Sequence, residues 1–426
     1  MTTSHEISRA VACLVFMALS VCSAAGAPNY DESKVGNYTL PDPLVLQNGE
    51  PVRDAETWYK QRRPEIVHLY ETNIHGRSPG RPEGMTFDVI DVDNHALGGK
   101  AVRKQVVVNF TGKKDGPKMN MLIYLPADAK QPVPLFLCLN FFANHRICDD
   151  PGVKINEEWD RKIMAKVLPD EKTRGTFKGW QIDKILSRGY GIAIIYYCDI
   201  EPDSIGGMQY GVRPLFFKPG QLGPAPDEWG AIGAWAWGLS RGLDYLESDK
   251  DVDAKRVVAV GHSRLGKTVL WAGAQDTRFA MVIASCSGEM GGSLSRRNYG
   301  ETVDDMIRNF PYQFCTNFQK YAKHWDEMPV DSHMLISLIA PRPLYLNTGS
   351  EDQWADPKGE FLAAVAAGPV YRLLGKQGLD TDQMPPLDTP IMHTLGFQCH
   401  TGKHEILPED WDRFLNFADM HLKNRN

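Results

Sequence analysis

The chain has 426 residues, 42% of them hydrophobic, a length that suits one large α/β domain or two smaller ones. Its formal net charge of −6 excludes an electrostatic case for nucleic acid as a partner. Cys13 and Cys22 lie in the first 27 residues. The other cysteines are available for disulfides, whose pairing the sequence does not reveal.

Residues 1–27 have the layout of a secretory signal peptide. Arg9 precedes an apolar run over residues 10–21, and small residues follow at 24–27. The run is too short to span a bilayer comfortably, so we expect no membrane span. The residues before Cys22 faintly resemble a lipoprotein box, but Val21 stands where a smaller residue is expected. We therefore predict plain export, either to the periplasm or to the medium.

Residues 28–426 are predicted to form a single domain, and residues 28–100 to wrap around it with one helix near residues 55–75. Apolar runs predict strands over residues 104–110, 119–125, 134–140, 191–197, 257–260, 280–285 and 343–348. Helices are predicted over residues 179–187, 229–249, 268–276, 357–367 and 408–423. This alternation indicates an α/β fold with a mostly parallel sheet covered by helices on both faces, a three-layer sandwich.

A long segment, Glu201–Glu228, is dense in Gly and Pro and is predicted to be irregular. Loops of this length in compact domains are usually functional or mobile. Two interpretations stay open: the segment borders the mouth of a site, or it is a structural cover.

The most informative motif is Gly261-His262-Ser263-Arg264-Leu265-Gly266-Lys267, which joins an apolar run to an amphipathic stretch. Strand, sharp turn and helix in this order present the nucleophilic serine of a hydrolase. Glycines permit the strained turn, and the helix N-terminus stabilises a developing oxyanion. Leu265 stands where the second glycine of a G-x-S-x-G elbow belongs, and Gly266 comes one place later.

Two cations beside Ser263 give the motif its character. Arg264 and Lys267 suit a substrate that is acidic or rich in hydroxyl groups. By letter the motif also matches a phosphate-binding Walker A loop, although such loops normally have small residues where the backbone wraps phosphate. A plain buried serine is the remaining alternative.

A nucleophilic serine needs a histidine base and a carboxylate that orients it. The strand over residues 343–348 runs into an acidic loop, where Asp352 is the predicted acid and Glu351 and Asp356 are its rivals. The alternative role of this loop is to cap the helix after Pro357. His404, in a loop before the last helix, is the predicted base.

Two further assignments concern the surroundings of the triad. His400, four residues before His404, raises the alternative of a zinc pair, but the sequence has no H-E-x-x-H motif. The oxyanion hole is predicted from the backbone N–H of Arg264 and from the loop over residues 139–145, with the Arg264 side chain as an added charged donor. Structural pairing of Arg264 with an acid is the alternative.

Motifs further along the chain complete a pattern. Residues 331–336 run into Ala340-Pro341-Arg342-Pro343, and the acidic loop and the Gly402-Lys403-His404 ending follow. With the elbow, they resemble glucuronoyl esterases of carbohydrate esterase family 15, bacterial branch, from about residue 100 to the C-terminus.

The resemblance implies an α/β-hydrolase fold and a serine esterase that cleaves the ester between 4-O-methyl-glucuronate of glucuronoxylan and lignin alcohols. It implies a Ser263–His404–Asp352 triad, an acyl-enzyme, Arg264 at the oxyanion, and no metal or cofactor. Lys267, Glu301 and Trp354 fall where the family binds sugar hydroxyls. The alternatives are core packing for Trp354 and a surface pair for the two charges. We expect a monomer.

The chain departs from the family at one position. Many members carry the catalytic Glu after the strand that follows the elbow, and ungapped alignment puts Cys286 in that place. An unperturbed thiol is mostly protonated at neutral pH and cannot hold a histidine as a carboxylate does. This shifts the weight to Asp352, while Glu289 is a possible substitute acid three residues on.

Two other functions stay open. An acetyl-xylan or other short-chain carbohydrate esterase would not need Lys267 and Arg264 together. A glycan-binding protein that has lost its activity is the second, and the cysteine at position 286 gives it some weight.

Overall fold

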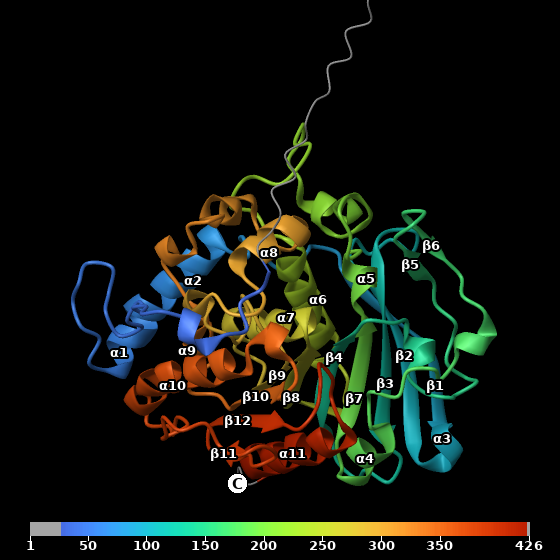
Figure 1. Ribbon diagram of the computed structural model, residues 1–426. Coiled ribbons are helices and arrows are strands. Elements are labelled where there is room, and N and C mark those ends of the chain that lie inside the picture. Colours follow the sequence, from blue (N-terminus) through green and yellow to red (C-terminus); the bar gives the residue numbers. More distant parts are fainter. Residues whose placement is uncertain (1–26, 424–426) are drawn as a thin grey trace, which may run out of the picture.

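A ten-stranded sheet runs through the part of the chain that the computed structural model describes, residues 27–423 (Figure 1). The strand order is β1-β2-β3-β7-β4-β8-β9-β10-β12-β11, and β5 and β6 form a separate hairpin. The strands are β1 (Thr86–His95), β2 (Ala101–Asn109), β3 (Lys118–Pro126), β4 (Val133–Asn140), β5 (Glu158–Asp160), β6 (Ala165–Val167), β7 (Gly191–Tyr196), β8 (Val252–His262), β9 (Met281–Ser285), β10 (Leu344–Gly349), β11 (Ile391–Met392) and β12 (Leu395–His400). The expected signal peptide lies outside the described residues, among which no helix is long and apolar enough to cross a membrane.

The sheet is mixed in direction. The strands from β7 through β4, β8, β9 and β10 to β12 are parallel to their neighbours. The pairs β1–β2, β2–β3, β3–β7 and β11–β12 are antiparallel. The carboxyl ends of the parallel strands therefore meet at one edge, where ligands of open α/β sheets bind.

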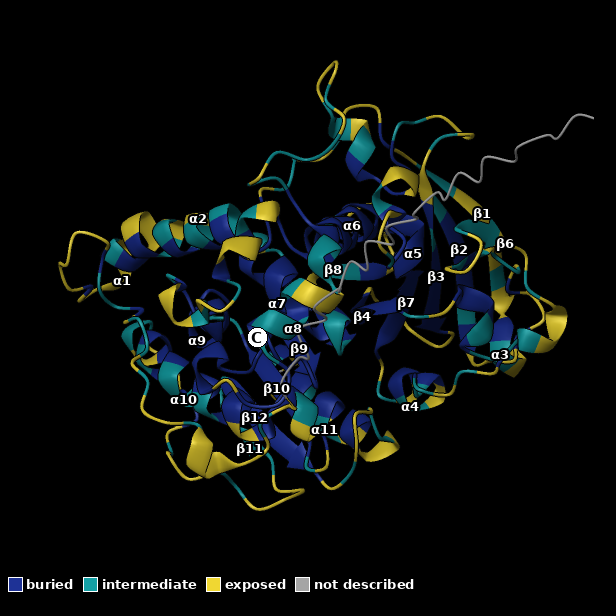
Figure 2. Cartoon of the chain, turned by 45° about the horizontal axis from the view of Figure 1, so that its top comes forward, coloured by how far each residue is buried: buried dark blue, intermediate teal, exposed yellow. Residues whose placement is uncertain are grey.

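Successive residues of the central strands feed two hydrophobic cores. In β4, Leu135, Leu137 and Leu139 belong to one core. Phe136 and Cys138 belong to the other. Because side chains of a strand alternate between the two faces, such fully apolar strands need cover on both sides. Figure 2 shows the central strands buried accordingly.

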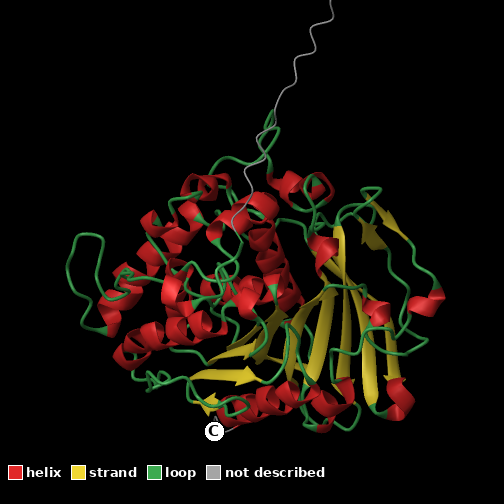
Figure 3. Ribbon diagram, in the orientation of Figure 1, coloured by secondary structure: helices red, strands yellow, loops and turns green. Residues whose placement is uncertain are grey.

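Helices supply that cover, as Figures 1 and 3 show. The helices are α1 (Ala55–Thr57), α2 (Arg63–Asn73), α3 (Ala96–Gly99), α4 (Ile182–Ser187), α5 (Tyr197–Ile200), α6 (Ala231–Leu246), α7 (Arg264–Gln275), α8 (Val303–Asn309), α9 (Ser332–Ser337), α10 (Pro357–Leu373) and α11 (Pro408–Ala418). Helices α6, α7, α9 and α10 contribute to the first core, and α4 and α11 to the second. The α/β fold predicted from the sequence, with helices on both faces of a mostly parallel sheet, is confirmed.

The predicted helix near residues 55–75 is also present. The π-helical turn Trp58–Arg62 joins α1 to α2, so helical structure runs from Ala55 to Asn73. Arg63 of α2 donates to the backbone oxygen of Ala274, 2.5 Å away, and ties this helix to α7. The N-terminal segment thus packs against the helices behind the elbow.

The sheet begins earlier than the sequence indicated. We expected its first strand at residue 104, but β1 lies within the segment predicted as a wrap and pairs with β2. Most β1 side chains are exposed or half-exposed. Apolar and polar residues alternate on each side of a β-bulge between Val89 and Asp91, but the bulge breaks the regular period of two on which the strand prediction depends.

The last parallel strand, β12, was missed for a different reason. Its residues are all buried, but they include Gln398 and His400. The Gln398 amide donates to Asp410, 2.7 Å away, and to Asn347 at 3.1 Å. Buried polar side chains that satisfy one another break the apolar pattern on which strand prediction depends.

Two predicted helices differ most from their observed bounds. Helix α7 begins at Arg264 and not at residue 268, so Ser263 alone separates the end of β8 from the helix. Helix α10 continues to Leu373, past the predicted end at residue 367, with Pro369 inside it.

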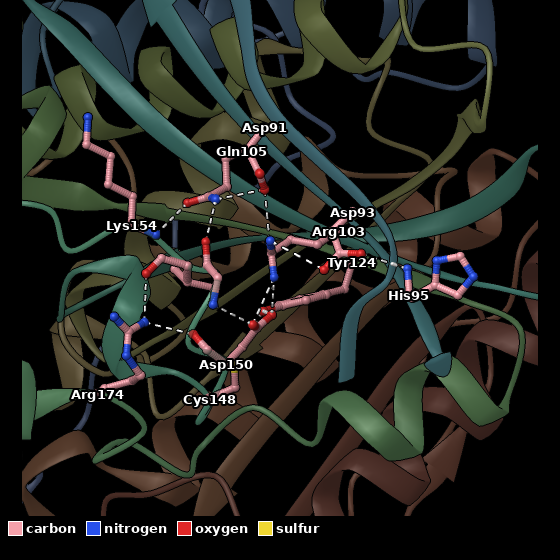
Figure 4. Close-up of polar contacts among 12 residues, drawn as sticks. Asp91, Asp93, His95, Arg103, Gln105, Tyr124, Cys148, Asp150, Lys154 and Arg174 are labelled. Atoms are coloured by element: carbon pink, nitrogen blue, oxygen red, sulfur yellow. Dashed lines mark hydrogen bonds and ion pairs between the residues drawn. The ribbon is translucent and has the colours of Figure 1, made fainter. Parts of the chain in front are cut away.

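A polar cluster ties the segment over residues 144–174 to the sheet (Figure 4). The Asp150 carboxylate accepts from Arg103 at 2.8 Å and from the Tyr124 hydroxyl at 2.7 Å. Arg174 donates to the Asp150 backbone oxygen, 2.8 Å away. Burial raises the pKa of Asp150, but Tyr124 and Arg103 outweigh it, so the pKa lies below its ordinary value. The cluster fixes the segment that leads into one wall of the site.

Candidate active site

Ser263 lies on the sharp turn between β8 and α7. Its φ of 59° and ψ of −131° fall outside the regions that non-glycine residues prefer. A Cβ at Gly261 would lie 2.0 Å from the Leu265 backbone oxygen, and one at Gly266 would lie 3.0 Å from that of Ser285. The close approach of strand and helix thus requires glycine at 261 and leaves little room for a side chain at 266, where the second glycine of this elbow stands.

His404 and Asp352 meet beside this turn, as predicted. Asp352 follows β10 and His404 follows β12, so two neighbouring parallel strands deliver them to the same edge of the sheet. The Nδ1 atom of His404 lies 2.6 Å from the Asp352 carboxylate. The Asp352 side chain is 5% exposed and that of His404 42%. A buried carboxylate therefore holds a solvent-accessible imidazole by one ring nitrogen.

The rival carboxylates have other surroundings. Asp356 caps α10 by accepting from the Gly359 N–H at 2.9 Å and pairs with Arg297 at 2.7 Å. Glu351 is exposed. Glu289 is buried and accepts from the Ser295 hydroxyl at 2.5 Å. Burial raises the pKa of Glu289 well above its ordinary value. None of the three contacts His404 among the described residues, so the structure does not bring Glu289 to the triad as a substitute acid.

Cys286 lies where the alignment put it. Its sulfur, a carboxylate oxygen of Asp352 and a ring nitrogen of His404 are all within 4.8 Å of one another. Burial raises the pKa of the thiol well above its ordinary value, and the charges of Glu360 and Asp352 act in the same direction. The thiol therefore stays neutral beside the histidine.

His400 belongs to a different arrangement. Its Nδ1 atom lies 3.1 Å from Asp410, and both side chains are fully buried. Burial lowers the pKa of His400, but Asp410 outweighs this and raises it. Within residues 27–423 the group with metal-ligand spacing at this edge comprises Cys286, Asp352 and His404 and does not include His400. The zinc pair of His400 and His404 considered from the sequence is not present.

Arg264 begins α7, so its backbone N–H has no partner within the helix. Its guanidinium lies 2.5 Å from Asp203, a fully buried carboxylate, and stacks over the Phe310 ring at 5.1 Å. The pairing with an acid considered from the sequence is therefore present. Asp203 lies in the Glu201–Glu228 segment, which touches the site through this residue.

Ser263, Asp352 and His404 line one cavity of about 370 Å³. The same cavity is lined by the three predicted substrate-binding residues, Lys267, Glu301 and Trp354. The Nζ atom of Lys267 lies 3.5 Å from the Glu301 carboxylate, and both side chains are almost fully buried. They are therefore not the surface pair considered from the sequence. Both cations of the elbow, Arg264 and Lys267, are paired with carboxylates, which argues against a phosphate-binding loop. We call this cavity the elbow pocket.

A second cavity, of about 440 Å³, adjoins His404. Aromatic and aliphatic side chains dominate its wall, and we call it the aromatic cavity. Its lining includes Phe141, Phe177, Trp180, His262, His404 and Ile406. The ring centroids of His262 and His404 are 4.6 Å apart. Burial, and after it the charge of His404, lowers the pKa of His262 to about 3. The loop over residues 139–145, predicted to complete the oxyanion hole, contributes Leu139, Asn140 and Phe141 to this cavity.

Sequence reasoning missed part of the wall. Met306, Phe310 and Gln313 line the elbow pocket and come from the long excursion between β9 and β10. Helix α8 begins with a capping box at Thr302 and Asp305, a Thr-x-x-Asp signal that could have located it. No local signal links Asp203 to Arg264, because the pair is 61 residues apart.

The site combines an elbow serine, a histidine and a buried aspartate at the carboxyl edge of a mostly parallel sheet. This combination is typical of serine hydrolases. The protein is a carboxylic ester hydrolase of the α/β-hydrolase type. The family described as "Glucuronyl esterase, fungi" matches residues 216–375. The chain belongs to the glucuronoyl esterases of carbohydrate esterase family 15.

Individual relatives support this assignment. The glucuronoyl esterase from Solibacter usitatus is 50% identical with a TM-score of 0.89, covering 92% of this chain and 100% of that one. A CE15 esterase from a marine bacterial metagenome, described as promiscuous, is 46% identical with a TM-score of 0.86, covering 93% and 100%. The 4-O-methyl-glucuronoyl methylesterase of Phanerochaete carnosa is 33% identical over 79% of this chain and 72% of its own length.

Proposed function

We propose that the enzyme hydrolyses the ester between (4-O-methyl-)glucuronate of glucuronoxylan and lignin alcohols. The observation that carries this is the buried Lys267–Glu301 pair, which lines the same cavity as Ser263. Lys267 donates and Glu301 accepts, so together they can bind adjacent sugar hydroxyls. Trp354 offers a ring face or an N–H to a pyranose. A small acetyl group would use none of these contacts.

Ser263, His404 and Asp352 carry out the reaction in this proposal. The Ser263 oxygen attacks the uronate C6 carbonyl while its proton passes to Nε2 of His404. Asp352, 2.6 Å from Nδ1, fixes the tautomer and stabilises the imidazolium. His404 then gives this proton to the alcohol oxygen as the bond between that oxygen and C6 breaks. The alcohol departs, and the glucuronoyl group stays bound to Ser263 as an ester. Water, deprotonated by His404, cleaves that ester and restores the serine.

Arg264 provides the oxyanion site. The carbonyl oxygen becomes negative in the tetrahedral intermediate, next to the Arg264 backbone N–H and guanidinium. Preorganised donors of this kind are each worth about 10²–10³ in kcat.

The aromatic cavity takes the alcohol. It opens beside His404, the residue that must protonate the leaving oxygen, and Phe141, Phe177 and Trp180 line it. Aromatic rings pack favourably against phenylpropane units of lignin. The acid part of the substrate then lies in the elbow pocket and the alcohol part on the other side of His404.

The test is kcat/KM on benzyl glucuronate beside 4-nitrophenyl acetate, for wild type and Ser263→Ala. We expect a strong preference for the uronate ester, abolished in the variant. Preference for acetate would move the protein to the short-chain carbohydrate esterases. Hydrolysis of neither ester, with no labelling of Ser263 by a fluorophosphonate, would favour a glycan-binding protein without activity.

A further inference from the structure

Asp203 is a buried carboxylate with an unusual number of donors. Five side chains from different parts of the fold donate to it, and its own side chain is fully buried. They are Arg264 at 2.5 Å, Arg161 at 2.7 Å, Tyr197 at 2.8 Å, Tyr312 at 2.6 Å and Gln313 at 3.2 Å. Such a carboxylate stays charged and immobile, because its hydrogen-bonding capacity is nearly filled.

We propose that Asp203 is the positioning residue of the oxyanion hole and that Arg161 balances its charge. The proposal rests on the proposed function in one respect, the role of Arg264 at the oxyanion. An arginine side chain has several rotatable bonds and no fixed position of its own. One guanidinium nitrogen of Arg264 is held by Asp203, and the Phe310 ring covers the group at 5.1 Å. The other N–H groups are then fixed on the wall of the elbow pocket.

Charge explains why a second arginine is needed. A lone Asp203–Arg264 pair would be neutral, and its carboxylate would repel a developing oxyanion. Arg161 shares the same Asp203 oxygen with Arg264, so the three groups together carry one net positive charge. Burial raises the pKa of Asp203, but Arg264 and the Tyr312 and Tyr197 hydroxyls outweigh it, and the pKa lies below its ordinary value. The cluster therefore keeps its charge state when the reaction begins.

Arg161 reaches the site only through Asp203. It belongs to the turn between β5 and β6, and its side chain is 57% exposed. It does not line the elbow pocket as the described residues define it. A surface arginine in a hairpin is thus predicted to influence kcat, which neither its exposure nor its position in the sequence suggests.

The chain offers matched controls in the same hairpin and in the same stretch of chain as Asp203. Asp199 of α5 is a buried aspartate four residues before Asp203, and it pairs with Lys166 of β6 at 3.1 Å. This second pair joins the same hairpin to the same region without contacting Arg264. Asp199→Asn and Lys166→Gln therefore report what the loss of a structural pair costs here.

The experiment is a double-mutant cycle with Arg264→Ala and Asp203→Asn, measured on benzyl glucuronate and on 4-nitrophenyl acetate. We expect Asp203→Asn to lower kcat about 10- to 100-fold, part of the value of an oxyanion donor, with KM within about twofold. In the Arg264→Ala background the same change should have almost no further effect, because the residue it positions is gone. Asp199→Asn should keep kcat within about twofold.

Arg161→Gln gives a second, independent measurement should Asp203→Asn fail to fold. We expect kcat to fall about 3- to 10-fold at low salt, with less difference from wild type at high salt, because an exposed charge is screened. Lys166→Gln should show neither effect. Additive losses in the cycle, or equal losses in the Asp199 and Lys166 variants, would overturn the positioning role.

The two esters separate failure of this proposal from failure of the proposed function. An oxyanion hole serves any ester, so a protein that prefers acetate would disprove the proposed substrate while the cycle stays measurable. A wild type that hydrolyses neither ester would overturn both.

Discussion

The elbow pocket and the aromatic cavity adjoin the same histidine, yet their walls differ in kind. The elbow pocket carries two ion pairs, Lys267–Glu301 and Arg264–Asp203, on residues within or near its wall. The aromatic cavity is lined mainly by rings and aliphatic side chains. The difference indicates which half of an ester each can bind: the polyhydroxylated acid on one side of His404 and the aromatic alcohol on the other.

The largest expected effect concerns His404, which lines both cavities, and the carboxylate that holds it. Asp352→Ala should lower kcat about 10³- to 10⁴-fold on every ester, because His404 loses the carboxylate that orients it. Cys286→Ser should stay within about threefold, since the thiol is neutral and holds no charge against the histidine. Steady-state kinetics on benzyl glucuronate measures both. The reverse ranking would contradict the assignment of Asp352 as the acid.

The next effect should be confined to the acid side. Lys267→Ala is expected to lower kcat/KM for benzyl glucuronate about 10- to 100-fold, because a hydrogen bond from a charged group contributes about 1.5–3 kcal/mol. Hydrolysis of 4-nitrophenyl acetate should change less than about threefold. Equal losses on both esters would mean that Lys267 supports the fold and not the sugar.

A smaller effect should be confined to the alcohol side. Phe177→Ala should lower the ratio of kcat/KM for benzyl over methyl glucuronate about 2- to 10-fold, since one aromatic contact contributes about 0.5–1.5 kcal/mol. Ile163→Ala, at an exposed position outside the cavity, is the control. An unchanged ratio in Phe177→Ala would remove the aromatic cavity from the account of the alcohol.

The last prediction concerns the pH dependence of the free energy of unfolding, which we assign to a histidine that lines neither cavity. His75 is fully buried away from the site, and burial lowers its pKa to about 3. Between pH 6.5 and 3 the unfolded state binds a proton there and the native state does not, so stability falls as the pH falls through this window. His75→Phe should remove up to about 1.4 kcal/mol per pH unit of that loss.

Urea unfolding at pH 7, 6 and 5 measures the difference. His68→Gln, at an exposed position on α2, is the control and should leave the pH dependence of wild type unchanged. A His75→Phe variant with the pH dependence of wild type would place the acid sensitivity elsewhere.

The residues of the candidate site could be predicted from the sequence more completely than the strands of the sheet. The elbow and the loops of Asp352 and His404 were predictable because each depends on a local rule: glycine at a close approach, or a polar residue directly after a buried strand. Strand β12 was not predictable, because the hydrogen bonds of Gln398 to Asp410 and Asn347 replace the apolar pattern with a buried polar one.

Long-range pairing accounts for the rest. Asp356 caps α10 through a contact with Gly359, three residues along the chain, and the sequence indicated that role. Which carboxylate faces His404 depends on tertiary packing, because Asp352 and His404 are 52 residues apart. The Asp203–Arg264 contact joins a loop to a helix 61 residues later. A buried charged residue indicates that a partner is needed, but the identity of that partner depends on the tertiary fold.

The most direct test of the division between the two cavities is a crystal structure of Ser263→Ala with benzyl glucuronate bound. The account predicts the uronate ring in the elbow pocket, with its hydroxyls on Lys267 and Glu301, and the benzyl ring beside Phe177 and Trp180. A uronate ring in the aromatic cavity, or a benzyl ring against Lys267, would contradict it.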